Sequence, residues 1–514
     1  MRQLKLLGAA LGAALLVAAC GGGGGGDPFG TQVASPARGQ LMQNPPAAIY
    51  SLTAAGFTAS LNAKPSGQSL LQLTGAPICG VDIQYIKYGT VGGAGEKTDA
   101  SGVLMVPTGA DPKCTGARPI VLYGHGTNIT RRYNLAEFTD DTNPANSESV
   151  LLAAMYVAQG YIVVAPNYAG YDSSSLGYHP YVNAEQQSKD MIDALAAAKS
   201  ALPAGKAGTK LFVTGYSQGG FVAMATQRAL QLAGTPVTAS APMSGPYALA
   251  AYLDAIFYGN VALGSTAFAP LATHSFQKAY GNIYTTPADM YETAYATDIE
   301  SLVPGAYDFT SVYSSGKLPQ TTLFSSTPPA APFAGITPPT GTGATDALFA
   351  LGFGTSNLIK NSARLAYLTD AMANPDGAVP SPTTAMPAAN PLNKIRIAAK
   401  ANDLRGWTPT SPTLLCGGNA DPTVFYSVNT QLMATLWTPQ VTAGLVTVLD
   451  VDSAPGTPGA TNPFYAAKAG FAQQKAALIA SAGANAASAV TTAYHGSLVP
   501  PFCNAAARGF FSQF

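Results

Sequence analysis

The sequence predicts an α/β fold, a doubly wound and mostly parallel sheet that carries a large, mainly helical cap insertion. Short apolar runs alternate with segments of helical periodicity along the first half of the chain. Uninterrupted apolar runs of this length are typical of parallel strands that helices cover on both faces. The expected parallel strands are residues 119–123, 161–165, 211–214, 237–242, 413–416 and 445–451, and the expected helices are residues 149–159, 186–201, 221–232 and 464–482, with one more at the C-terminus.

Two further segments complete this organisation. Residues 81–88 and 102–106 alternate and are rich in β-forming residues, so they predict an antiparallel hairpin before the parallel strands. The strand and helix alternation breaks down over residues 247–405 into helical pieces and proline-rich stretches. At that point an insertion forms a cap over the strand ends, where ligands bind in such sheets. A separate domain is the alternative. The core then comprises residues 47–246 and 406–514.

The first residues predict export. Residues 1–19 combine a basic start with an apolar run that is too short for a membrane helix, as in a signal peptide. The run ends at Cys20 in a pattern that resembles a bacterial lipobox, which implies cleavage before this cysteine and lipidation of its sulfur. An ordinary secretory signal is the alternative. Residues 20–46, which open on a glycine run, are expected to form a flexible tether. We expect a lipid-anchored protein, in the outer membrane if the cell is Gram-negative, or one released from the cell.

Charge excludes several classes of partner. Lys+Arg and Asp+Glu both number 26, and no stretch gathers basic residues. This balance argues against a nucleic-acid partner and against a membrane surface held by charge, so the lipid anchor is the expected membrane contact. It also favours an uncharged substrate. We expect a monomer.

Four cysteines remain after the lipidation site. An even number in an oxidising compartment indicates two disulfides rather than metal ligation. Three connectivities are possible. We favour one pair that brackets the opening strands and a second that lies close in sequence to the candidate acid and histidine, namely Cys79 with Cys114 and Cys416 with Cys503.

Ser217 is the candidate nucleophile. It stands in Gly-Tyr-Ser-Gln-Gly, the pattern of a serine raised on a strained turn between a strand and a helix. Glycines on either side are needed because side chains there would collide with neighbouring backbone. The apolar run 211–214 before this turn and the helical run 221–232 after it supply the required context.

A serine hydroxyl needs a base and an acid that orients the base. Where a nucleophile sits on such a turn, the acid and then the histidine follow it along the chain. Among the four histidines only His495, in a turn-like loop before the last helix, lies far enough downstream. Asp421 follows a predicted strand and a glycine-containing loop, and is the expected acid. Asp450 and Asp452 are the rivals, and because His495 comes well after that strand its loop must be elaborated.

A glycine-containing loop at residues 123–127 follows the expected strand 119–123. Backbone N–H groups in such a loop stabilise the oxyanion of acyl transfer together with the amide of the residue after the nucleophile, here Gln218. Gly126 or Thr127 is expected to supply the other amide. His125 is not expected to bind a metal, because no second histidine lies at ligand spacing, and a loop-stabilising hydrogen bond is expected instead. The predicted substrate contacts are Tyr216 and His125.

These motifs together resemble a known family. Residues 124–127, 165–170, 215–220, 406–409 and 416–421 are similar to the secretory lipase and esterase branch of the α/β-hydrolase superfamily. The resemblance covers the core and is weak in the cap. It implies hydrolysis of carboxylic esters through an acyl-enzyme, without a cofactor or metal.

Three functions remain open from the sequence. The expected one is an esterase or lipase that acts on a small-molecule or lipid-like ester, with the cap roofing an apolar acyl pocket. A serine exopeptidase would use the same residues but add a charged anchor for a peptide terminus, and the cap has few charges. The third is a non-catalytic surface-binding lipoprotein on the same scaffold.

Overall fold

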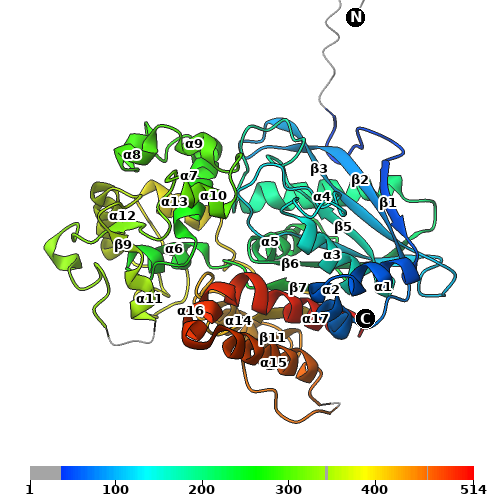
Figure 1. Cartoon of the computed structure of the whole chain (residues 1–514). Helices are drawn as coiled ribbons and strands as arrows, with labels where there is room; N and C mark the ends of the chain where they lie inside the picture. Colours follow the sequence, from blue (N-terminus) through cyan, green and yellow to red (C-terminus); the bar gives the residue numbers. More distant parts are fainter. Residues whose placement is uncertain (1–35, 342–344, 460) are drawn as a thin grey trace, which may run out of the picture. The chain divides into compact units, whose positions relative to one another are not determined.

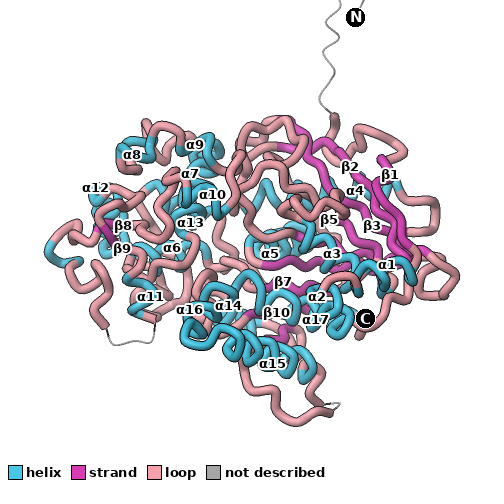
Figure 2. Tube along the Cα trace, in the orientation of Figure 1, coloured by secondary structure: helices cyan, strands magenta, loops and turns pink. Residues whose placement is uncertain are grey.

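A twisted β-sheet organises the chain (Figures 1 and 2). The computed structural model describes residues 36–341, 345–459 and 461–514, and these belong to one unit, Ser35–Phe514. Its nine-stranded sheet has the order β1-β2-β3-β5-β4-β6-β7-β10-β11. The strands are β1 Ala47–Leu52, β2 Gly80–Val91, β3 Lys97–Thr108, β4 Arg118–Gly124, β5 Ile162–Pro166, β6 Ala207–Tyr216, β7 Ala239–Met243, β10 Thr413–Gly417 and β11 Val446–Asp450.

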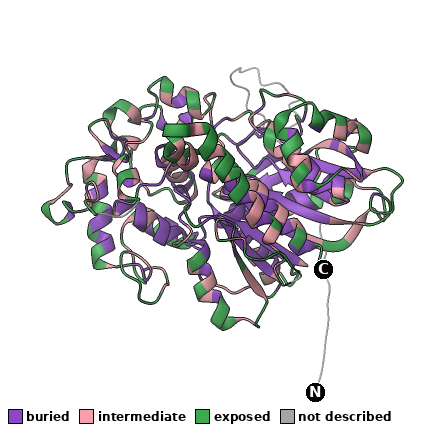
Figure 3. Cartoon of the chain, turned by 60° about the horizontal axis from the view of Figure 1, so that its bottom comes forward, coloured by how far each residue is buried: buried purple, intermediate pink, exposed green. Residues whose placement is uncertain are grey.

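Strand direction agrees with the sequence prediction. Strands β5, β4, β6, β7, β10 and β11 run parallel to one another. Strands β1, β2 and β3 form antiparallel pairs, and β3 also pairs antiparallel with β5. The predicted hairpin is therefore confirmed as β2 and β3. Every residue of β5, β7 and β10 is buried, as expected for central strands covered on both faces (Figure 3).

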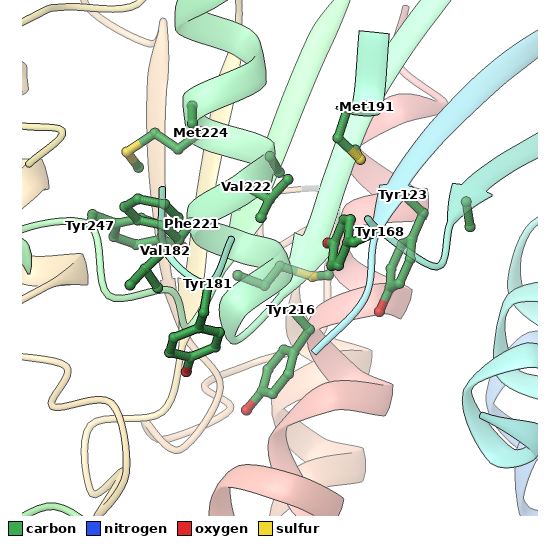
Figure 4. Packing of buried hydrophobic residues seen from close by; sticks show 14 of the residues in the cluster. Tyr123, Tyr168, Tyr181, Val182, Met191, Tyr216, Phe221, Val222, Met224 and Tyr247 are labelled. Atoms are coloured by element: carbon green, nitrogen blue, oxygen red, sulfur yellow. The ribbon is translucent and has the colours of Figure 1, made fainter. Parts of the chain in front are cut away.

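Two groups of helices cover the sheet, as the doubly wound prediction requires. Helices α4 and α5 pack against each other and against the central strands, while α2, α3 and α17 form a second group. Helix α5 follows β6 directly, and Figure 4 shows its Phe221, Val222 and Met224 among the buried side chains. The bounds are α2 Pro65–Thr74, α3 Asn146–Met155, α4 Ala184–Ala201, α5 Gln218–Leu232 and α17 Val499–Phe511.

The cap insertion lies between β7 and β10 and is mainly helical. The two-stranded sheet β8–β9 is its small β element (Figure 2). The backbone N–H of Leu263 donates to the carbonyl of Pro422 at 3.0 Å, so the cap contacts the loop after β10. Its elements are α6 Leu249–Phe257, α7 Ser265–Tyr280, α8 Thr293–Ala296, α9 Ile299–Leu302, α10 Phe309–Ser314, β8 Phe324–Ser325, α11 Asp346–Ala350, β9 Phe353–Gly354, α12 Asn361–Ala373 and α13 Lys394–Ala401.

Buried ion pairs hold the cap helices together. Arg396 on α13 reaches Asp254 on α6 at 2.9 Å and Asp370 on α12 at 2.8 Å, and its side chain is 3% exposed. Arg405 pairs in the same way with Asp376 at 2.7 Å. Removing one partner would leave a buried charge uncompensated, so the pairs of Arg396 tie α13 to α6 and α12, and the Arg405 pair ties together the loops that follow α12 and α13.

Several elements were not predicted. Strand β1 and the helices α1 Ala54–Asn62 and α14 Thr430–Trp437 were missed, as was α2. Residues 36–46, assigned to the tether, are bonded along β2: the N–H of Gly39 donates to the carbonyl of Gly89 at 2.8 Å, and Arg38 pairs with Asp193 at 3.0 Å. The folded part therefore begins earlier than predicted. The predicted signal peptide, the predicted lipidation site Cys20 and the glycine run lie outside the described residues.

The chain after β11 is almost continuously helical. Helix α15 spans Tyr465–Ala482, α16 spans Ala486–Ala493, and a π-helical turn, Tyr494–Leu498, leads into α17. By length and composition alone, this stretch of the described chain, Tyr465–Phe511, would suffice to cross a membrane. The stretch is divided: α15 and α16 are separate helices that pack on each other, and the largely buried α17 packs on β10.

Both favoured disulfides are present. Cys79 is bonded to Cys114 and Cys416 to Cys503, with Cα atoms 5.5 Å and 5.7 Å apart. The first joins the start of β2 to the loop before β4. The second joins β10 to α17, elements separated by 87 residues in sequence.

Removing the second disulfide should destabilise the fold. We expect the Cys416→Ala/Cys503→Ala variant to lose about 2 to 5 kcal/mol of unfolding free energy, because the bridge restricts the unfolded chain over a long loop. Guanidinium unfolding of the variant and the parent protein measures this difference. An unchanged midpoint and slope would contradict the prediction.

Candidate active site

Ser217 occupies the turn between β6 and α5. β6 ends at Tyr216 and α5 begins at Gln218, and the backbone of Ser217 has φ 60° and ψ −122°. This left-handed φ is strained for a residue with a side chain. Gly219 relieves the crowding around it, since a Cβ there would lie 1.8 Å from the carbonyl oxygen of Gly124. The turn is thus the strained strand-to-helix geometry that the sequence predicted.

His495 lies against the serine. Its Nε2 is 2.8 Å from Ser217 Oγ, and its Nδ1 is 2.6 Å from Asp421 Oδ2. The imidazole is 13% exposed and the carboxylate 1%. If Nδ1 carries the proton that faces the carboxylate, Nε2 is free to accept the hydroxyl proton of the serine. The structure therefore brings together the three residues that sequence reasoning selected.

Asp421 is held by its own loop. Its Oδ1 accepts from the backbone N–H of Thr423 at 2.9 Å and of Val424 at 3.0 Å, which leaves Oδ2 for the histidine. The rival acids have other partners: Asp450 accepts from Asn419, whereas Asp452 pairs with a lysine and a tyrosine. Two backbone donors fix the orientation of the Asp421 carboxylate toward the imidazole.

His495 stands in a helical element, so the prediction of a turn-like loop was wrong. It belongs to the π-helical turn that joins α16 to α17. A π-turn inserts an extra residue in a helix and is frequent at functional sites. The hydroxyl of Tyr216 donates to the carbonyl of His495 at 2.7 Å and so ties this turn to the nucleophile turn. Burial raises the pKa of Tyr216 well above its usual value, which keeps this donor protonated.

The predicted oxyanion amides differ in their partners. Gly126 N–H points toward Glu148 Oε1 at 3.4 Å, and that carboxylate also accepts from Tyr123 at 2.9 Å. The amides of Thr127 and Gln218 have no protein hydrogen-bond partner within the described parts of the chain. Both residues line a cavity together with Ser217. Thr127 and Gln218 are therefore the better placed pair of donors, and Gly126 is less suited.

His125 does not reach a substrate, so that prediction was wrong. Its side chain is fully buried and stacks between the rings of Tyr133 and Tyr168, with centroids 4.3 Å and 4.1 Å away. Its Nδ1 lies 2.7 Å from the carbonyl of Gly126 and its Nε2 lies 3.1 Å from that of Asn167. These contacts stabilise the glycine loop, which is the hydrogen-bonding role that the sequence analysis expected for His125. Burial lowers the pKa of His125.

Sequence reasoning missed a second buried histidine. His179 Nδ1 lies 2.9 Å from the carbonyl of Ala169, which requires that nitrogen to carry the proton. Its Nε2 then accepts from Gln218 Nε2 at 2.7 Å. Burial lowers the pKa of His179 to about 3, so the ring stays neutral and keeps this acceptor. It fixes the side chain of the residue whose amide faces the nucleophile, and no local motif marked it.

Two cavities meet at Ser217. One is an apolar cavity of about 80 Å³ that runs between α6 and α7, lined among others by Leu253, Ile256 and Ala272. The other is an open groove of about 2060 Å³ that extends from α1 and α2 past His495 to α15, α16 and the cap. Tyr216 lines the groove but is only 5% exposed. The nucleophile thus lies where a narrow apolar cavity meets a wide, open groove.

The chemistry of this arrangement needs no further group on the protein. A serine hydroxyl that is hydrogen-bonded to an imidazole is an activated nucleophile when the imidazole is in turn hydrogen-bonded to a buried carboxylate. Two free amides beside it can receive the negative charge of a tetrahedral intermediate. No set of three or more His, Cys, Asp and Glu side chains that could hold a metal occurs in the described ranges. The geometry supports acyl transfer.

Comparison with known proteins gives two kinds of match. The model of the prolyl oligopeptidase family matches residues 148–234, the part that runs from α3 to α5 and contains Ser217. A crystal structure of the rice cell wall degrading esterase LipA from Xanthomonas oryzae is similar over 92% of this chain and 98% of that chain, with 25% identity and a TM-score of 0.66.

A second solved structure supports the fold. A protein from Legionella pneumophila is similar over 80% of this chain and 91% of its own, with 20% identity and a TM-score of 0.59. No curated protein matches the chain. The solved structures cover core and cap together, whereas the family model covers only the segment around the nucleophile.

Proposed function

We propose that this chain, which has the fold of an α/β-hydrolase, cleaves carboxylic esters with Ser217 as nucleophile, His495 as general base and Asp421 as the acid of the triad. The observation that carries the proposal is the pair of contacts at His495, 2.8 Å to Ser217 Oγ and 2.6 Å to Asp421 Oδ2. It is the geometry that a serine hydrolase requires.

The proposed reaction follows from these positions. Ser217 Oγ attacks the ester carbonyl carbon while His495 Nε2 takes the hydroxyl proton, and the carbonyl oxygen becomes an oxyanion facing the amides of Thr127 and Gln218. Collapse of this intermediate breaks the bond to the alcohol, which leaves with the proton from His495. Water then attacks the acyl-enzyme by the same route and releases the acid. Asp421 stabilises the imidazolium in each step.

The lining of the apolar cavity favours an acyl chain as its occupant. Leu253 and Ile256 on α6 and Phe268 and Ala272 on α7 line it, together with Ser217. An acyl group bonded to Ser217 Oγ can extend into this space, while the alcohol portion lies in the open groove. A narrow cavity of this kind favours an unbranched chain.

A serine exopeptidase is the second candidate, because the family model that matches residues 148–234 describes peptidases. An exopeptidase needs a free charge to bind a peptide terminus. Three charged side chains line the groove besides His495, and each is engaged: Lys64 pairs with Asp141 at 2.5 Å, and Glu148 accepts from two tyrosines. This engagement favours ester over peptide substrates.

A comparison of substrates decides between these candidates. We expect the mature protein to hydrolyse p-nitrophenyl esters from acetate to decanoate and to leave aminoacyl and X-Pro p-nitroanilides uncleaved. Initial rates are measured at equal concentration, with uncatalysed hydrolysis subtracted. Cleavage of the anilides with kcat/KM equal to or above that of the best ester would assign the peptidase function. Inactivity toward both classes would remove the hydrolase proposal.

Filling the apolar cavity should shift acyl preference. We expect Ala272→Phe to lower kcat/KM for p-nitrophenyl octanoate about tenfold or more, because the ring occupies space needed by the chain. Acetate hydrolysis by the same variant is the internal control and should change less than about threefold, since the acetyl group does not reach α7. Equal losses for both esters would show that this cavity does not bind the acyl chain.

Export of the protein with a lipid on Cys20 is the remaining part of the proposal. The two disulfides support an oxidising compartment outside the cytoplasm. Labelling cells with a radioactive fatty acid tests the anchor, and the parent protein should carry the label while Cys20→Ala does not. Label on both proteins would place the lipid elsewhere.

A further inference from the structure

We propose that Tyr494 is a positioning residue for the Asp421–His495 pair, and that Asp452 and Lys475 hold it in place. The inference rests on the proposed function, because it concerns how the acid and base of the same site are kept at their separation. Tyr494 lies directly before His495 in the π-helical turn and is 1% exposed. It touches neither the nucleophile nor the oxyanion amides.

The hydroxyl of Tyr494 joins two segments that are far apart in sequence. It accepts from the backbone N–H of Ala420 at 3.2 Å and donates to Asp452 Oδ2 at 2.7 Å. Ala420 lies directly before Asp421, as Tyr494 lies directly before His495. One oxygen atom thus connects the backbone beside the acid with the turn that carries the base. Burial and the Asp452 carboxylate raise the pKa of Tyr494, so the hydroxyl keeps its proton.

The phenol ring has little freedom to move. A Cβ on Gly418 would lie 2.6 Å from the Tyr494 hydroxyl oxygen, so the acid loop approaches the ring as closely as a glycine allows. On another side Lys475 Nζ of α15 lies 5.7 Å from the centroids of both Tyr494 and Phe471, in cation–π geometry. The same ammonium group pairs with Asp452 at 2.7 Å and 2.9 Å. Lysine and carboxylate therefore fix the acceptor of the tyrosine hydroxyl.

The rival acids of the sequence analysis gain a role in this arrangement. Asp450 accepts from the side-chain amide of Asn419 at 2.7 Å and from its backbone N–H at 3.1 Å. Asp452 holds Tyr494, which holds Ala420. The two carboxylates at the end of β11 thus support successive residues of the loop that presents Asp421. Because displacement of a reacting group by about 1 Å can cost about 10²-fold in rate, this support bears directly on turnover.

The test removes the hydroxyl and keeps the ring. We expect Tyr494→Phe to lower kcat for a p-nitrophenyl ester about 10- to 100-fold while KM changes less than about twofold, because the acid and base lose alignment and the substrate cavities are untouched. Rates are normalised to the fraction of enzyme that a fluorophosphonate label titrates. The matched control is Tyr156→Phe, another fully buried phenol, bonded to Asn504 on α17, which should retain the parent kcat.

A double-mutant cycle separates positioning from general support of the fold. If Tyr494 acts through Asp421, its substitution should change kcat less than about twofold in an Asp421→Asn background, because the alignment it protects is already lost. An equal loss in both backgrounds would overturn the proposal. So would parent-like kcat in Tyr494→Phe.

Two further variants keep the proposal falsifiable. Asp452→Ala removes the acceptor of the hydroxyl, and should lower kcat in the same direction by about threefold or more with KM unchanged, even if Tyr494→Phe fails to fold. A parent-like kcat in Asp452→Ala would also count against the positioning role of Tyr494. Failure of the proposed function gives a different result. A Ser217→Ala variant that retains activity would refute the assignment of the triad. An inactive Ser217→Ala together with a fully active Tyr494→Phe would refute only the positioning role of Tyr494.

Discussion

Replacing Ser217 by alanine is expected to lower kcat for a p-nitrophenyl ester about 10⁴-fold or more. The variant lacks the oxygen that forms the acyl-enzyme, and the remaining amides can only stabilise attack by water. The strain at this turn, φ 60°, also disfavours any larger replacement. Steady-state rates with enzyme at high concentration, and loss of fluorophosphonate labelling, measure the effect.

A neighbouring serine supplies the control. Ser240 is a fully buried residue of β7 whose hydroxyl donates to the carbonyl of Val213 at 3.0 Å, so Ser240→Ala removes a serine hydroxyl from the same sheet without touching the site. We expect parent-like kcat from it. Undiminished hydrolysis by Ser217→Ala would mean that another group is the nucleophile, and the non-catalytic reading of the scaffold would gain support if the parent protein were equally inactive.

Asp421→Asn is the second substitution for which we expect a severe loss, about 10⁴-fold in kcat. An amide at this position no longer compensates the imidazolium that forms when His495 takes the serine proton, and it favours the wrong tautomer of the ring. Its two backbone donors, Thr423 and Val424, would still hold an amide oxygen, so the loop geometry should survive. The kcat of the variant on the best p-nitrophenyl ester measures the loss.

Asp450→Asn tests the assignment of the acid. Its carboxylate supports Asn419, and an amide oxygen can still accept from the backbone of that residue, so we expect at most about a tenfold loss. A severe loss in Asp450→Asn together with a mild one in Asp421→Asn would reassign the acid.

The fold and the three triad residues could be predicted from the sequence because local sequence patterns determine them. Ser217 has glycines at both sides, an apolar strand before it and a helix after it, and each signal reflects a local steric requirement. Asp421 and His495 followed from chain order once the nucleophile was chosen. The parallel strands could also be predicted, because a strand that is buried on both faces has an uninterrupted apolar sequence.

The features that the sequence did not predict depend on contacts between segments that are distant in the chain. The turn-like appearance of Tyr-His-Gly-Ser hid a π-helical turn, because the flanking alanine-rich helices decide the conformation there. His125 was assigned to the substrate, yet the rings of Tyr133 and Tyr168 stack on its imidazole. Tyr494 carries no motif at all. Its role depends on two hydrogen bonds of its hydroxyl group, one from the backbone N–H of Ala420 and one to Asp452 after β11.

The second disulfide encloses the proton-transfer half of the site. Cys416 stands before Asp421 and Cys503 after His495, so acid and base belong to one covalently closed loop, while Ser217 lies outside it. In a reducing cytoplasm that loop is open and its two catalytic side chains depend on packing alone for their separation. Oxidation of the two thiols closes it. Maturation of the catalytic apparatus is thereby coupled to the redox state of the compartment in which the chain folds.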